Sequence, residues 1–244
     1  MNNKIHCISY ASNHFIPRST TFLNEANSFN LFSSIDIHSP DTITQSFKEN
    51  YKDILKMPRG GGYWLWKLDI LTQKFNSIST GDIVFYLDVG CTINNTPKSM
   101  RRFWEYIDII NDNSFLRFQL THPEICYTNS TALQFFAKKY KINLDDISNT
   151  NQFSATIFGM KKDNTSLNFL NELTNIIKEN PHLITDEYNL ICKNDKFIDH
   201  RHDQSLLSLL HKCLNLKYSM QDETYSLDWS ELSHVPFLAT RKRS

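Results

Sequence analysis

An acidic residue that directly follows an apolar run is the first candidate for chemistry in this sequence. The segment "GDIVFYLDVGCTIN" (81–94) joins a nearly continuous run of strand-forming residues to Asp88 and Gly90. Ligands of open α/β sheets bind beyond the carboxyl ends of the strands, so Asp88 lies where a ligand is expected. Its carboxylate could coordinate a divalent metal that bridges to a diphosphate, while Gly90 lets the backbone approach the ligand. The structural alternative is a turn capped by Asp88, in which Gly90 has a positive φ angle.

A second candidate is the segment "DHRHDQS" (199–205), where two acids and two histidines lie within five residues. Imidazole and carboxylate are zinc ligands, but alternate residues seldom converge on one ion, and no second ligand cluster is visible. The structural alternative is a helix N-terminus, where an acid satisfies free backbone N–H groups. The same hydrogen bonds would keep Asp203 ionised, which suits a general base or a group that binds a hydroxyl.

These residues need a layered sheet to bring them together. From residue 4 to about residue 160, strand-forming runs alternate with helical periodicity, which is typical of an α/β sheet flanked by helices. We expect strands at 4–10, 33–38, 82–90, 115–120 and 153–162. We expect helices around 22–29, 43–54, 63–78, 97–110, 130–140, 166–179 and 203–214, and an irregular tail at 235–244. The length and the absence of repeats or linkers predict a single domain over residues 1–244.

Composition narrows the class of partner. Lys plus Arg and Asp plus Glu are equal at 26 each, so no net field favours binding to nucleic acid. The five cysteines are scattered singly, which favours a reducing compartment over a disulfide framework. No stretch approaches the roughly 18 uninterrupted apolar residues that a membrane span needs. These features predict a cytoplasmic protein, with peripheral contact at the inner face of the membrane as a further option.

Four segments together resemble a known family. The segments "GGGYWLWK" (60–67), "YLDVG" (86–90), "QFSATIFGMKK" (152–162) and "HRHDQSLLSLL" (200–210) occur in the order found in GT-A glycosyltransferases, and the resemblance spans roughly residues 4–243. It looks closest to bacterial polysaccharide-type transferases. It implies a GT-A-like, Rossmann-like mixed α/β sheet, a nucleotide-sugar donor, and a glycan or lipid-linked saccharide acceptor in surface polysaccharide synthesis. The sugar would be a hexosyl or deoxyhexosyl group.

The resemblance also assigns roles to residues. The segment "LDVG" lies where the family has its DxD motif, which holds Mn²⁺ or Mg²⁺ and the donor diphosphate, but Gly90 replaces the second acid. Metal binding by Asp88 therefore needs another ligand, and His234 is a candidate because imidazole can join a carboxylate around Mn²⁺. Asp203 and Gln204 are predicted to contact sugar hydroxyls. Gln152 resembles the polar residue that some retaining members present to the anomeric carbon. Ordinary packing of His234 and a turn position for Gln152 are the alternatives.

Aromatic and basic residues complete the predicted donor site. An aromatic face can stack on a sugar or base, Lys67 can offset phosphate charge, and the glycines after Arg59 open a helix whose amides favour an anion. The basic tail either folds over the diphosphate, touches an anionic membrane, or is simply solvated. The predicted donor-binding residues are Tyr10, Ala11, Ser12, Arg59, Tyr63, Trp66, Lys67, Asp88, Val89, Gly90, Arg241, Lys242 and Arg243.

Two other functions remain open from the sequence. A binding module that keeps the fold without turnover is consistent with the incomplete acidic motif. Nucleotidyl transfer to a sugar phosphate also uses an α/β sheet and a divalent ion, but the first strand is followed by "YASNHFIPRS", which is poor in glycine and basic residues. Stereochemistry is open as well, since an inverting route needs a carboxylate near the acceptor hydroxyl and Asp203 could fill that role.

Overall fold

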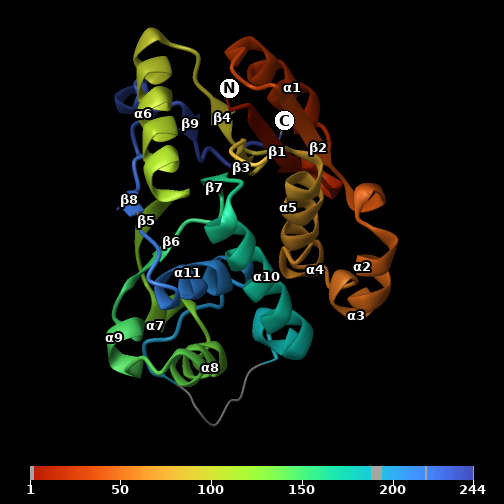
Figure 1. The fold of residues 1–244 in the computed structure, drawn as a ribbon, viewed down its shortest axis with the longest axis vertical. Helices are drawn as coiled ribbons and strands as arrows, with labels where there is room; N and C mark the ends of the chain where they lie inside the picture. The colour runs from red at the N-terminus through yellow and green to blue at the C-terminus, as the bar shows by residue number, and fades with distance from the viewer. Residues whose placement is uncertain (1–2, 188–193, 218, 244) are drawn as a thin grey trace.

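A mixed β-sheet forms the centre of the molecule (Figure 1). The computed structural model describes residues 3–187, 194–217 and 219–243. Within them, seven strands form one sheet in the order β2-β1-β3-β7-β5-β6, with β8 beside β5. Their bounds are β1 (Ile5–Tyr10), β2 (Ser34–His38), β3 (Ile83–Leu87), β5 (Phe115–Pro123), β6 (Asn151–Phe153), β7 (Ile157–Lys161) and β8 (Ser219–Gln221). Strand β1 is parallel to β2 and β3, whereas β7 is antiparallel to β3 and β5. The predicted mixed α/β class is confirmed.

Helices cover both faces of the sheet because its central strands are apolar on both sides. Along β3, Phe85 packs into one hydrophobic cluster and its neighbours Val84 and Tyr86 into the other, as the alternation of side chains in a strand requires. One cluster lies under α1 (Arg18–Phe29) and α6 (Pro97–Asn113). The other lies under α5 (Trp66–Ser77), α8 (Ser130–Tyr140), α10 (Asn164–Glu179) and α11 (Asp203–Cys213).

Three elements differ from the sequence-based expectations. The helix expected at 43–54 is split at Tyr51, whose φ of −121° is not helical, into α2 (Gln45–Asn50) and α3 (Lys52–Leu55). The helix expected from residue 63 begins at Trp66, and the short helix α4 (Gly60–Tyr63) precedes it. The strand expected at 153–162 is two strands, because the pairing with β5 is interrupted after Phe153 and resumes in β7, which from Ile157 also pairs with β3. The remaining short helices are α7 (Glu124–Tyr127) and α9 (Leu144–Ser148).

The delayed start of α5 follows from the glycines before it. Gly60, Gly61 and Gly62 all have positive φ angles, and the left-handed turn continues through Tyr63 and Trp64 at φ 57° and 59°. Residues other than glycine seldom adopt this conformation, so the turn is held by its surroundings. The consequence is that the right-handed helix can begin only after Trp64.

Apart from one two-residue strand, the tail at 235–243 has no regular secondary structure, as expected, but it packs against the turn that follows β3. Within it, β9 (Phe237–Leu238) pairs antiparallel with β4 (Thr92–Ile93). Further along, the backbone N–H of Lys242 donates to the carbonyl oxygen of Gly90 at 2.9 Å. Lys242 therefore lies beside the turn at the end of β3.

Gly90 serves this contact and not a left-handed turn. Gly90 is not among the glycines with positive φ, so that part of the turn alternative is wrong. A Cβ atom at Gly90 would lie 3.0 Å from the carbonyl oxygen of Lys242 and 3.1 Å from the Cα of Arg241. Such contacts are tighter than van der Waals packing allows, so only glycine lets the tail approach this closely.

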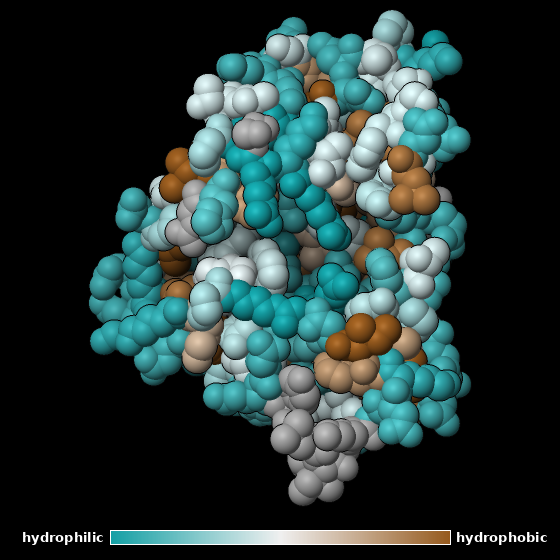
Figure 2. All heavy atoms as spheres, turned by 180° about the vertical axis from the view of Figure 1, so that it is seen from behind, coloured by the Kyte–Doolittle hydropathy of each residue, from teal (hydrophilic) through white to brown (hydrophobic). Residues whose placement is uncertain are grey.

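One broad face of the molecule is mostly hydrophilic, with hydrophobic side chains in small separate groups and a hollow near its middle (Figure 2). None of the helices within residues 3–187, 194–217 and 219–243 is long and apolar enough to cross a membrane.

Candidate active site

A cavity of about 500 Å³ lies at the carboxyl ends of β1 and β3. Its volume is in the range of small-ligand sites, and its position is where open α/β sheets bind ligands. The structure brings twelve of the predicted site residues to its wall: Tyr10, Ser12, Arg59, Trp66, Lys67, Asp88, Val89, Gly90, Asp203, Gln204, Arg241 and Arg243. Segments more than 200 residues apart in the chain thus meet at one site.

Asp88 is held in place by the turn after β3. Its backbone N–H donates to the carbonyl oxygen of Thr156 at 2.9 Å, and its own carbonyl accepts from Cys91 N at 2.8 Å, as in a β-turn. The hydroxyl of Tyr86 donates to Asp88 Oδ1 at 2.5 Å. Burial and the Asp88 charge raise the pKa of Tyr86 well above its usual value, so Tyr86 remains a donor. No donor among the described residues reaches the second carboxylate oxygen of Asp88, which leaves it for a ligand.

A buried ion pair joins α5 to the start of α11. Lys67 Nζ contacts Asp203 Oδ2, donates to the carbonyl oxygen of Ala155 at 2.9 Å, and lies 4.5 Å from the ring centroid of Tyr86. Both side chains are almost fully buried. Lys67 and Asp203 therefore form one charged unit in the cavity wall.

Asp203 is less acidic than the sequence predicted. Burial raises its pKa to about 6, although Lys67 lowers it, and the nearby Asp88 adds to the increase. The loss of water therefore outweighs the helix amides, but a carboxyl group with a pKa of about 6 is still mostly ionised at pH 7. Asp203 is also not the cap, since His202 occupies the N-cap position of α11, with no side-chain hydrogen bond.

Gln204 reaches the cavity and Gln152 lies behind it. Gln204 Nε2 donates to Gln152 Oε1 at 2.7 Å, while the backbone N–H of Ala155 donates to Gln204 Oε1 at 3.4 Å. Gln152 is completely buried, and its amide donates to Glu124 Oε2 at 3.1 Å. The prediction that Gln152 meets the reacting carbon is corrected, because its side chain holds Gln204 and does not line the cavity. Glu124, which anchors the pair, was not found from the sequence.

Aromatic rings form one wall of the cavity. Tyr10 stacks on Trp66 with ring centroids 3.7 Å apart and 12° between the planes, and Trp66 Nε1 donates to the carbonyl oxygen of Gly60 at 2.9 Å. Tyr63 lies behind this wall, buried against His202 with centroids 4.5 Å apart. Ala11 is also buried, among the core residues. Tyr63 and Ala11 thus support the cavity without lining it.

The basic residues of the cavity fall into two groups. Arg59 is neutralised by Asp199, whose Oδ2 accepts from it at 2.6 Å, and Arg201 lies 3.7 Å from the same carboxylate. Arg241 and Arg243 also line the cavity, and neither has an ion-pair partner in the described part of the chain. Lys242, between them, points its backbone at Gly90 and is absent from the lining. The tail therefore brings to the cavity two arginines without a carboxylate partner in the described residues, and the guanidinium of Arg243 lies 5.8 Å from the ring centroid of Phe15.

The second predicted metal ligand does not come near the first. His234 is exposed, its Nδ1 lies 3.2 Å from the carbonyl oxygen of Glu231, and it does not line the cavity. Across residues 3–187, 194–217 and 219–243 there is no group of three or more His, Cys, Asp or Glu side chains fit to hold a metal. Asp88 alone remains, which fits Mg²⁺ or Mn²⁺ only where phosphate oxygens complete the coordination.

Several lining residues were not predicted. They are His14, Phe15, Pro58, Gly60, Gly61, Trp64, Cys91, Ala155, Thr156, Arg201 and His202. Arg201 and His202 lie inside the quoted segment "HRHDQSLLSLL". The donor-binding stretch predicted at the end of the first strand, 10–12, could have been extended to Phe15. The sequence around Ala155 and Thr156 does not indicate that they line the site, because they reach it only where the chain passes from β6 to β7.

Comparison with known proteins defines the fold. No protein-family model and no curated protein matches the chain. Xyloside xylosyltransferase 1 from mouse, in its apo form, is similar in structure with a TM-score of 0.50 and 10% identity, covering 97% of this chain and 96% of that chain. A glycosyltransferase involved in the glycosylation of the major capsid of PBCV-1 gives a TM-score of 0.46 at 11% identity, covering 96% and 93%. The chain has a GT-A-type fold, as the resemblance predicted, and at these identities the similarity establishes the fold alone.

Proposed function

We propose that this protein is a glycosyltransferase that moves a sugar from a nucleotide-sugar donor to a hydroxyl group of a saccharide acceptor. The observation that carries the proposal is the cavity itself: on a GT-A-type fold, it combines Asp88, the Lys67–Asp203 pair and the two arginines of the tail. The name of the structurally similar xylosyltransferase supports the same reaction class. As the sequence resemblance implies, the acceptor is a glycan or lipid-linked saccharide of surface polysaccharide synthesis.

The reaction needs a stabilised leaving group. The bond between the anomeric carbon and the diphosphate oxygen breaks with its electron pair on the oxygen, and the acceptor oxygen bonds to the same carbon as it loses its proton. Arg241 and Arg243 have no carboxylate partner among the described residues, so their charge is available to the diphosphate. A divalent ion held by Asp88 and the donor phosphates would add positive charge at the same place.

The other side of the cavity suits the sugars. Asp203 Oδ2 is bound by Lys67, and the backbone of Gln204 also approaches the carboxylate, but no other side chain of the described residues donates to it. The carboxylate therefore keeps capacity to accept a hydrogen bond from a sugar hydroxyl. Gln204 is fixed by Gln152, which orients its amide for a second hydroxyl. Because the pKa of Asp203 is about 6, its carboxylate is charged and able to accept an acceptor proton above that pH.

A turnover assay tests the proposal. The purified protein is incubated with a panel of nucleotide-sugars and simple glycoside acceptors, with Mn²⁺ or with chelator, and each product is identified by mass spectrometry. We expect nucleoside diphosphate and a glycosylated acceptor with one class of donor. Release of inorganic diphosphate would indicate nucleotidyl transfer instead. A donor-dependent rise in melting temperature without any turnover would indicate a binding module.

A further inference from the structure

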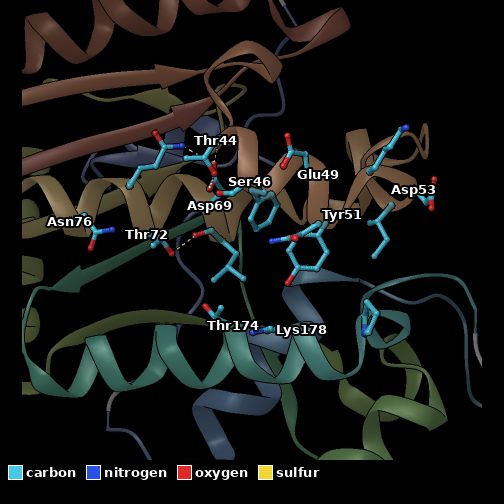
Figure 3. A pocket seen from close by; sticks show the side chains of 17 residues that line it. Thr44, Ser46, Glu49, Tyr51, Asp53, Asp69, Thr72, Asn76, Thr174 and Lys178 are labelled. Carbon is cyan, nitrogen blue, oxygen red and sulfur yellow. Dashed lines mark hydrogen bonds between the residues drawn. The ribbon is translucent and has the colours of Figure 1, made fainter.

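A second, larger cavity lies on the other side of α5. It has a volume of about 800 Å³ and is enclosed by the segment from α2 to α3, by α5 and by α10. Helix α5 separates the two cavities, because Lys67 lines the candidate active site while Thr72 and Asn76, further along the helix, line the second cavity. Figure 3 shows Tyr51 lying between α2 and α3 on one side and Thr174 and Lys178 of α10 on the other.

The floor of this cavity is preformed. Asp69 is buried on α5 and accepts hydrogen bonds from Thr44 N at 2.9 Å, Thr44 Oγ1 at 2.7 Å and Gln73 Nε2 at 2.7 Å. These bonds fasten the start of α2 to α5 (Figure 3). A ligand that enters the cavity would therefore meet a wall that is already ordered, which lowers the entropic cost of binding.

The lining combines aromatic faces with uncharged polar groups. The rings of Phe47 and Tyr51 are half-buried, with centroids 4.6 Å apart. The amides of Asn50 and Asn76 and the hydroxyl of Ser46 have no hydrogen-bond partner among the described residues. Ring faces present apolar surface to the C–H groups of a ligand, while amides and hydroxyls can pair with its hydroxyl groups.

The charge of the lining differs from that of the candidate active site. Its charged residues are three acids, Glu49, Asp53 and Asp69, and two lysines, Lys52 and Lys178. The small excess of acid disfavours phosphate and other anions, whereas arginines predominate in the first cavity. An uncharged ligand rich in hydroxyl groups is the chemistry that fits aromatic faces, free amides and no excess of cations.

We propose that this cavity binds uncharged sugar residues of a glycan, as a site separate from the one where transfer occurs. The proposal rests on the proposed function for the source of the ligand, namely the part of the acceptor glycan remote from the reacting end. Binding there would hold a long acceptor on the enzyme between transfers, because two linked sites raise the effective concentration of the reacting end.

Saturation-transfer NMR tests this binding without turnover. The probes are uncharged linear tetrasaccharides of glucose, galactose, mannose or N-acetylglucosamine, measured with the full chain. We expect at least one of them to bind the wild type. Tyr51→Ala should weaken binding about three- to tenfold through the lost ring contact, and Asn76→Ala, at an exposed residue without a partner, by a similar factor.

The controls separate this site from the candidate active site. Asn175→Ala, on the exposed side of α10 and outside the cavity, should leave binding unchanged. Asp88→Asn and saturating nucleoside diphosphate should also leave it unchanged, because they act in the other cavity. Absence of any tetrasaccharide signal, displacement by nucleoside diphosphate, or full binding by both Tyr51→Ala and Asn76→Ala would overturn the proposal. Binding that persists in a protein with no transferase activity would overturn the proposed function alone.

Discussion

Helix α11 takes part in two buried ion pairs, one near each end. Asp203, its first residue, pairs with Lys67, and Lys212, near its last turn, pairs with Glu124 at 2.6 Å. The two pairs have the same chemical groups and similar burial. They differ in how completely the carboxylate is satisfied by the protein.

Glu124 has no capacity left for a ligand. Its Oε1 accepts from Ser208 Oγ at 2.5 Å and from Lys212 Nζ at 2.6 Å. Its Oε2 accepts from the hydroxyl of Thr128 and from Gln152 Nε2 at 3.1 Å. A buried carboxylate with four donors from its own chain is a structural group, because any ligand would have to displace one of them.

Asp203 is the opposite case, since only Lys67 among the side chains of the described residues donates to it, and it lines a cavity. A buried ion pair is therefore no sign of function by itself. What distinguishes the functional pair is a carboxylate that lines a cavity and is approached by few donors, Lys67 and the backbone of Gln204. The two pairs are linked, because Gln152 bonds to Glu124 on one side and to Gln204, next to Asp203, on the other.

The largest effect is expected from Asp203→Asn. The change keeps the size of the side chain but removes the charge, so it also lowers stability by leaving the buried Lys67 without its charge partner. In the folded variant we expect turnover to fall about 100- to 1,000-fold, because a positioned base is lost. Steady-state kinetics measures this, with circular dichroism to verify the fold. Turnover within twofold of the wild type would show that the carboxylate of Asp203 has no catalytic use.

Glu124→Gln should instead reduce stability. It leaves the Lys212 ammonium group without its charge partner in the protein interior, which costs about 3–5 kcal/mol. Denaturant unfolding measures the loss, and Glu172→Gln is the matched control, because Glu172 pairs with Lys139 near the surface and should cost at most about 1 kcal/mol. If Glu124→Gln is stable but inactive, the Glu124–Lys212 pair is the functional one and its assignment as structural is wrong.

Lys67→Met should move the pH dependence of turnover. Activity is expected to rise with pH through about 6 as Asp203 loses its proton. Lys67 lowers the pKa of Asp203, so its removal raises that pKa and shifts the acidic limb upwards by about one pH unit or more. The pH profile of kcat/KM checks this. If the acidic limb of the kcat/KM profile stays at the same pH or moves to lower pH, a group other than Asp203 controls it.

The smallest effect is expected from Gly90→Ala. The added Cβ pushes the backbone of Arg241 and Lys242 outwards by a few tenths of an ångström. A displacement of 1 Å costs about 100-fold, so we expect KM for the donor to rise about three- to tenfold with little change in kcat. Lys98→Ala, at an exposed residue on α6, is the control for surface charge. An unchanged KM would separate the tail from donor binding.

Much of the fold could be predicted from the sequence, because periodicity along each segment is a local signal. The strands around 4–10 and 82–90 and the helices at 97–110 and 166–179 lie close to where they were expected. Strand pairing is not local, so the split of 153–162 into β6 and β7 could not be predicted. The same holds for β9, which is only two residues long and depends on β4.

The site residues also differ in whether a local sequence signal indicates them. Asp88 and Asp203 stand at the end or start of a predicted element and Lys67 lies near the start of a predicted helix, so the sequence alone indicates a position for each. Glu124 is a single acid in "THPEICYT", and its partners outside this segment lie on β6 and α11, so no local pattern indicates it. The prediction that His234 lies near Asp88 was wrong, because the sequence does not show which way a loop points.

We place sugar transfer in the cavity beside Asp88. The most direct measurement is kcat/KM for the donor that the turnover panel selects, compared between the wild type, Asp88→Asn and Asp108→Asn, an exposed aspartate on α6 outside the cavity. We predict a loss of at least about 100-fold for Asp88→Asn and wild-type kinetics for Asp108→Asn. Wild-type kinetics for Asp88→Asn would place the reaction elsewhere in the molecule.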